Sequence, residues 1–118
     1  AAGLATVKIL RDEDVHERLE VLSSRLETGI RDVLMDLKLP YDLNRVGSMM
    51  CLFFTEVPVD RFATAVTADT TAFDRYFEKM IRAGVNIAPS AFEASFVSAA
   101  HTEADIDRTV EIVRESLR

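Results

Sequence analysis

The chain has 118 residues, of which 48% are hydrophobic and 29% charged, a balance that suits one globular domain with a core of useful size. With a formal net charge of −6, nothing in the composition suggests the basic stripe that a nucleic-acid-binding surface needs. A single cysteine excludes an intrachain disulfide, and no apolar run reaches the ~18 residues that suggest a membrane span. Since no signal-peptide pattern opens the chain, we expect a cytoplasmic protein without nucleic-acid or membrane partners.

Two helices are predicted in the first third of the chain. Residues 2–10 have apolar side chains at helical spacing, and no capping residue precedes them. A helix that begins so abruptly is typical of the middle of a longer one, so we expect the chain to be part of a larger protein. Residues 14–37 form a long amphipathic helix whose other faces carry charges placed to pair. Its apolar stripe consists of Val15, Leu19, Leu22, Leu26, Ile30, Val33 and Leu37.

A strand pair is predicted next. Pro40 ends the long helix, because the residue before a proline is disfavoured in helical conformation. Residues 41–46 and 49–55 are predicted strands, with a bulge or turn at Gly47-Ser48. The second strand is apolar on both faces, which favours a central or covered position in the sheet.

The remaining elements are a helix, two strands and a closing helix. A short helix is expected within 61–68, and a firmer one after Asp69, ending at Gly84. Its predicted apolar face is Phe73, Phe77, Met80 and Ile81. Strands are expected at 85–87 and 92–99, and Thr102 to Asp105 has the form of a capping box. The closing helix should bury Ile106, Val110, Val113 and Leu117.

This order of elements predicts an α+β fold. We expect a two-layer sandwich, in which helices pack on one face of a mainly antiparallel sheet of about four strands. No repeat or second domain is visible, so residues 1–118 are expected to form a single domain.

The stretch from Ala88 to Thr102 is the least generic part of the sequence. A polar turn with a proline leads into an alternating run, which predicts that Phe92, Ala94 and Phe96 face the core. Glu93 would then point away from the core. The simplest explanation for a glutamate at this position is that its side chain lies on a solvated face of the sheet.

No complete active site is visible in the chain. Its three lysines, Lys8, Lys38 and Lys79, fall on helical segments or their ends, so none is predicted to be desolvated as a Schiff-base lysine must be. The four glycines stand too far apart for a phosphate loop. His16, His101, Cys51 and the acidic residues show no metal-ligand spacing. We expect no catalytic, cofactor-binding or metal-binding residue here.

Three separated segments resemble one enzyme family. The segment GVNIAPSAFEASFVSAAHTEADID, Gly84 to Asp107, is similar to the C-terminal signature of glutamate-1-semialdehyde 2,1-aminomutases, which belong to the class-III aminotransferases. The run RVGSMMCLFFTE, Arg45 to Glu56, resembles a second motif of that family, and residues 1–10 resemble its interdomain helix. Ser95 stands where the family usually has glycine.

The resemblance implies the small domain of a pyridoxal-phosphate enzyme of fold type I, with residues 1–12 as part of the interdomain helix. In that family a large N-terminal domain supplies the cofactor lysine, and the enzyme is a cytoplasmic homodimer. It converts glutamate-1-semialdehyde to 5-aminolevulinate in tetrapyrrole biosynthesis. The resemblance therefore implies that pyridoxal phosphate binds to the parent enzyme, and that these residues alone hold no cofactor and are inactive.

The resemblance also implies a substrate-facing wall formed by Ser90, Phe92 and Glu93. Glu93 would be the carboxylate that approaches the amine end of the substrate. No arginine or lysine lies between Gly84 and Asp107, so this region would repel a substrate carboxylate. We expect the former interdomain surface to include Leu4, Val7 and the neighbourhood of Phe92.

Two other interpretations remain open. The chain is the small domain of a different class-III aminotransferase, or it is a free-standing α+β interaction module. The order of helices and strands permits both.

Overall fold

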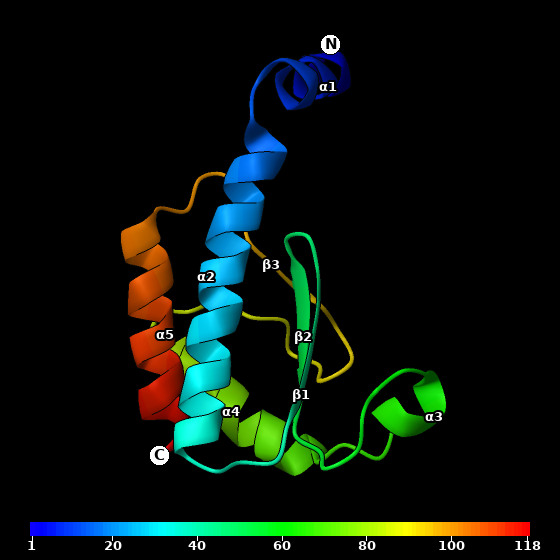
Figure 1. Ribbon diagram of the computed structural model, residues 1–118, viewed down its shortest axis with the longest axis vertical. Helices are drawn as coiled ribbons and strands as arrows, with labels where there is room; N and C mark the ends of the chain where they lie inside the picture. The colour runs from blue at the N-terminus through cyan, green and yellow to red at the C-terminus, as the bar shows by residue number, and fades with distance from the viewer.

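The computed structural model describes all 118 residues and contains five helices and three strands. Figure 1 shows their arrangement, with the long helix α2 at the centre. None of the helices combines the length and the apolarity that a membrane crossing requires. The elements in order are α1 (Ala2–Asp12), α2 (Val15–Asp36), β1 (Asp42–Val46), β2 (Met49–Phe53), α3 (Phe62–Ala65), α4 (Thr70–Arg82), β3 (Ser95–Phe96) and α5 (Glu103–Leu117).

The sheet is antiparallel, with β2 between β1 and β3. The central position predicted for the apolar second strand is therefore confirmed. Leu43 pairs with Leu52 and Arg45 with Met50, so these four side chains share one face of the sheet. We call it the inner face, because Leu43 and Met50 belong to the same buried core as the helices. The opposite face is the outer face.

The helices α2, α4 and α5 form the layer against the inner face. The structure confirms an α+β fold of this kind, although the sheet has three strands where about four were predicted. Helices α2 and α5 run side by side (Figure 1), and their apolar stripes meet the sheet in one core. The most completely buried members of that core are Val33, Leu34, Met80 and Val113.

The helix ends follow local chemistry. The Asp69 carboxylate accepts a hydrogen bond from the Ala72 backbone N–H at 2.9 Å and caps α4. Thr102 and Asp105 form the predicted capping box at the start of α5. Gly84 follows the end of α4 with a φ of +90°, a conformation that glycine adopts without strain. The buried face of α4 includes Tyr76, whereas Ile81, predicted to lie on that face, is 41% exposed.

The prediction of two strands between Gly84 and Ala99 is largely wrong. Residues 85–87 are not a strand, and only Ser95–Phe96 pairs with β2. Phe92 and Phe96 are 50% and 65% exposed, whereas Ala91 and Val97 are buried. Because side chains alternate across a strand, the apolar set expected to face the core lies on the opposite side.

Helix α1 extends from the N-terminal end of α2, away from the sheet (Figure 1). None of its eleven residues is buried. Leu4 and Val7, which were expected to belong to an interdomain surface, are 63% and 61% exposed.

Candidate functional site

The predicted wall residues lie in one compact turn between α4 and β3. The Glu93 backbone N–H donates to the carbonyl oxygen of Ser90 at 3.1 Å. The Phe92 backbone N–H donates to the Ser90 hydroxyl at 3.2 Å. Ser90 therefore closes the turn with both its backbone and its side chain, as serine does in many tight turns. Its neighbour Ala91 is buried and anchors the turn in the core.

Glu93 presents its carboxylate to solvent. The residue is exposed, and it takes part in none of the ten salt bridges of the chain. The turn thus carries an uncompensated negative charge on a segment without arginine or lysine. Such a group is able to accept a hydrogen bond from an approaching cation.

Cys51 supports this turn from β2. Its Sγ lies 3.7 Å from the carbonyl oxygen of Ala91 and 3.5 Å from that of Glu93, within the range of weak S–H donation. Burial raises the pKa of the Cys51 thiol, which keeps it protonated and able to donate. This position suits a small packing residue better than a nucleophile.

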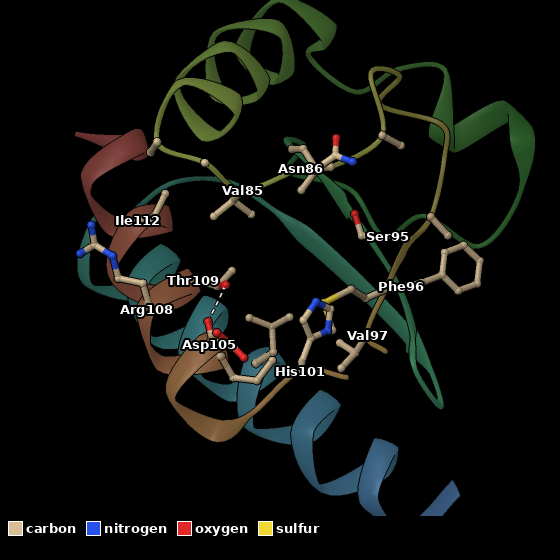
Figure 2. A pocket seen from close by; sticks show the side chains of 18 of the residues that line it. Val85, Asn86, Ser95, Phe96, Val97, His101, Asp105, Arg108, Thr109 and Ile112 are labelled. Atoms are coloured by element: carbon tan, nitrogen blue, oxygen red, sulfur yellow. Dashed lines mark hydrogen bonds between the residues drawn. The ribbon is translucent and has the colours of Figure 1, made fainter. Parts of the chain in front are cut away.

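A cavity of about 750 Å³ lies behind β3, bordered by α5 and residues 83–89. Figure 2 shows the imidazole of His101 and the side chain of Val97 at this cavity, with Arg108 and Thr109 on α5. The ring of Phe96 points away from it. Glu93 does not line this cavity but borders a much smaller one of about 60 Å³.

Several polar groups around the larger cavity already have partners within the chain. His101 Nδ1 accepts from the Ser98 backbone N–H at 3.0 Å, and Arg108 pairs with Glu111 at 3.2 Å. The backbone N–H of Thr102, and after it the Thr102 hydroxyl, donate hydrogen bonds to the Asp105 carboxylate and lower its pKa. These contacts fix the start of α5, and the His101 side chain stabilises the turn that precedes this helix.

The residues present do not fit pyridoxal phosphate by themselves. Lys8, Lys38 and Lys79 are all exposed, so no lysine is held in the desolvated environment that covalent binding of an aldehyde cofactor requires. No group of three or more His, Cys, Asp or Glu side chains is placed to hold a metal ion. The turn can therefore contribute to a site but does not form a complete one.

Sequence reasoning missed a polar cluster centred on Arg45. Its guanidinium donates to Glu20 at 2.8 Å, to Glu27 at 2.5 Å and to the Gly47 carbonyl at 2.8 Å, although β1 and α2 are distant in sequence. The side chain of Arg45 is only 14% exposed. Arg45 stands on a strand that also carries Asp42 and Asn44, so its position in the sequence did not distinguish it from an ordinary surface cation. The cluster ties the β1–β2 turn to α2 and thereby holds the strand on which Cys51 supports the Ser90–Glu93 turn.

No protein-family profile matches the chain. Among curated proteins, a glutamate-1-semialdehyde 2,1-aminomutase of Brevibacillus brevis is 48% identical over 118 residues, which are 100% of this chain and 28% of the relative. The enzyme of the same name from Chlorobium phaeobacteroides is 50% identical over 109 residues, 92% of this chain and 25% of the relative. The chain thus spans about a quarter of the length of these relatives.

Solved structures show the same fold. A glutamate-1-semialdehyde aminomutase from Pseudomonas aeruginosa, in complex with PMP, matches 89% of this chain and 23% of its own with a TM-score of 0.79 at 22% identity. An omega-transaminase from Sphaerobacter thermophilus matches 86% of this chain and 23% of its own with a TM-score of 0.73 at 18% identity. The fold is that of an aminotransferase small domain, and the chain is homologous to the C-terminal part of glutamate-1-semialdehyde 2,1-aminomutases.

Proposed function

We propose that this chain is the small domain of a pyridoxal-phosphate-dependent glutamate-1-semialdehyde 2,1-aminomutase. That enzyme converts glutamate-1-semialdehyde to 5-aminolevulinate, the reaction that serves tetrapyrrole biosynthesis. The observation that carries the proposal is 48% identity to an aminomutase over all 118 residues, the Ser90–Glu93 turn included. We further propose a cytoplasmic homodimer in which residues 1–12 are part of the helix that joins the two domains.

The proposed role of Ser90, Phe92 and Glu93 is a wall that closes over the substrate. Pyridoxal phosphate, when bound by the large domain, supplies the electron-withdrawing chemistry of the amino transfer. The exposed carboxylate of Glu93 attracts an ammonium group and repels a carboxylate. At about 4 Å this interaction amounts to ~1 kcal/mol in water and ~4 kcal/mol at the effective dielectric near a protein surface. The turn would therefore favour the amine end of the substrate.

A second candidate is the small domain of another class-III aminotransferase. It is favoured by Ser95, which replaces the family's glycine, and by the shared fold of the omega-transaminase. However, Ser95 pairs with Met50 within the sheet and is half-buried. Its hydroxyl is accommodated by the strand, so this replacement is compatible with the aminomutase.

A fusion polypeptide provides the direct test. It consists of the Brevibacillus brevis aminomutase with its matched C-terminal region replaced by these 118 residues. Formation of 5-aminolevulinate from glutamate-1-semialdehyde is the expected result. A folded, cofactor-loaded fusion that only transfers amino groups between different substrates would favour the second candidate. The unmodified aminomutase serves as the control.

A further inference from the structure

Residues 86–94, which include the proposed wall, have few polar attachments to the rest of the chain. The two hydrogen bonds within this segment both end on Ser90, so they shape the turn but do not place it on the sheet. The hydrogen bonds that join the segment to other residues come from Cys51. Its Sγ lies 3.7 Å from the carbonyl oxygen of Ala91 and 3.5 Å from that of Glu93. Cys51 is therefore the polar anchor of the turn.

Apolar packing adds little to this anchor. The cavity of about 750 Å³ is bordered by residues 83–89 and by Ala94, so this stretch is not packed against α5 along its whole length. Of the four residues from Ser90 to Glu93, only Ala91 is buried. Its side chain is a single methyl group, which removes little apolar area from water. The contacts from Cys51 therefore carry a large share of what fixes the turn.

Cys51 itself stands on a well-fixed strand. It belongs to β2, the central strand of the sheet, and Arg45 ties the adjoining β1–β2 turn to α2. The Ser48 carbonyl oxygen in that turn accepts a hydrogen bond from the Val97 backbone N–H at 3.0 Å. The thiol is protonated, because burial raises its pKa, and its one proton can serve either of the two carbonyl oxygens within reach. The anchor is thus held more firmly than the segment that it contacts.

We propose that Cys51 is a positioning residue for Glu93. Its thiol holds the backbone carbonyls of Ala91 and Glu93, so the Glu93 side chain leaves the turn in a fixed direction. This proposal rests on the proposed function in one respect, which is that the Glu93 carboxylate faces the amine end of the substrate. The attraction between two charges falls as their separation grows. A displaced Glu93 would therefore discriminate less between an amine end and a carboxylate end.

Two variants of nearly equal shape test the proposal in the fusion polypeptide. Threonine and valine are both branched at Cβ and both suit a strand, but only threonine has a hydroxyl that can donate a hydrogen bond. The measured quantity is the ratio of kcat/KM for substrate analogues with an amine end and with a carboxylate end. We expect this ratio to be at least three times lower in Cys51→Val than in Cys51→Thr. Equal ratios in the two variants would overturn the proposal.

A Glu93→Gln background shows whether the effect passes through the Glu93 carboxylate. Glutamine carries no charge, so its displacement should no longer change the discrimination between the two substrate ends. The difference between Cys51→Val and Cys51→Thr should therefore shrink to less than about 1.5-fold, which is the non-additivity expected of two residues that act together. A difference that persists in this background would mean that residue 51 acts on the fold in general, and would also overturn the proposal.

Hydrogen exchange followed by mass spectrometry gives a measurement that needs no substrate. In the fusion polypeptide, the amides of residues 86–94 should exchange at least five times faster in Cys51→Val than in Cys51→Thr, because loss of the anchor lets the turn open. The amides of α4 are the control and should exchange equally in both variants. Equal exchange of residues 86–94 in the two variants would show that Cys51 does not anchor the turn.

These measurements separate the positioning role from the proposed function. A difference between Cys51→Val and Cys51→Thr in a fusion that transfers amino groups but makes no 5-aminolevulinate would support the positioning role and contradict the mutase function. Formation of 5-aminolevulinate with equal substrate ratios in the two variants would contradict the positioning role alone.

Discussion

Gly29 of α2 and Val110 of α5 approach so closely that a Cβ added at Gly29 would lie 2.5 Å from Cγ2 of Val110 and 3.3 Å from its Cβ. Valine is branched at Cβ and has few alternative rotamers, so the helices would have to separate to admit a methyl group. The α2–α5 packing is thus set by one missing side chain in the middle of a long helix.

We predict that Gly29→Ala destabilises the protein by about 1–3 kcal/mol despite the higher helix propensity of alanine. Gly3→Ala is the matched control, because nothing lies within 4 Å of a Cβ there, and it should be neutral or stabilising. Urea unfolding followed by circular dichroism measures both. The double variant Gly29→Ala with Val110→Ala should be less destabilised than the sum of the two single variants. Strict additivity would contradict the steric explanation.

Arg45 links stability to pH through Glu20 and Glu27. The pKa of each of these two carboxyls lies below its ordinary value of 4.5, mainly because each accepts hydrogen bonds from Arg45. A lowered folded-state pKa contributes stability that is present above the unfolded-state pKa and is lost as the pH falls through the folded-state pKa. The cluster therefore stabilises the fold at neutral pH and loses its contribution on acidification below 4.5.

We predict that Arg45→Met lowers the free energy of unfolding by about 1.5–3 kcal/mol at neutral pH, since it removes one partner of a charged hydrogen-bonded pair. It should also flatten the decline of stability between about pH 5 and 3. Urea titrations at several pH values measure this slope. Arg82→Met is the control, because Arg82 pairs with Glu78 on an exposed surface and its loss should change little. An unchanged acid slope in Arg45→Met would show that the stability of the cluster does not depend on these two carboxyls.

The Cys51 thiol should react slowly with alkylating reagents. Its half-buried position and the pKa raised by burial both lower the fraction of reactive thiolate. We predict alkylation by iodoacetamide at about pH 8 at least ten times slower than that of glutathione. Mass spectrometry of timed samples gives the rate, and the urea-unfolded chain gives the reference for full exposure. Reaction as fast in the native as in the unfolded chain would mean that the Ser90–Glu93 turn does not cover the sulfur.

Glu93→Gln in the fusion polypeptide tests the charge of the wall turn. Removal of the negative charge should reduce the preference for an amine end over a carboxylate end about tenfold, which corresponds to ~1.4 kcal/mol. Competition between substrate analogues that differ in this end measures the ratio of kcat/KM values. Thermal unfolding should be nearly unchanged because Glu93 is exposed. Glu115→Gln is the control, and an identical substrate ratio in both variants would contradict a role for Glu93.

Local sequence patterns determined most of the helices and the first two strands. The apolar period of α2 and the caps Asp69 and Thr102 act within one or two helical turns, so the sequence alone revealed them. The turn at Ser90–Glu93 also follows from neighbouring residues, because its hydrogen bonds join positions two and three apart.

Tertiary contacts decided the rest. An alternating pattern predicts that successive side chains lie on opposite faces of a strand, but it does not determine which face meets the core. Because Phe96 pairs with Met49 in the sheet, the Phe96 ring lies on the solvent-exposed face, and the neighbouring Val97 is buried. Likewise, the Arg45 cluster and the close approach at Gly29 join segments far apart in sequence, and only the folded chain brings them together.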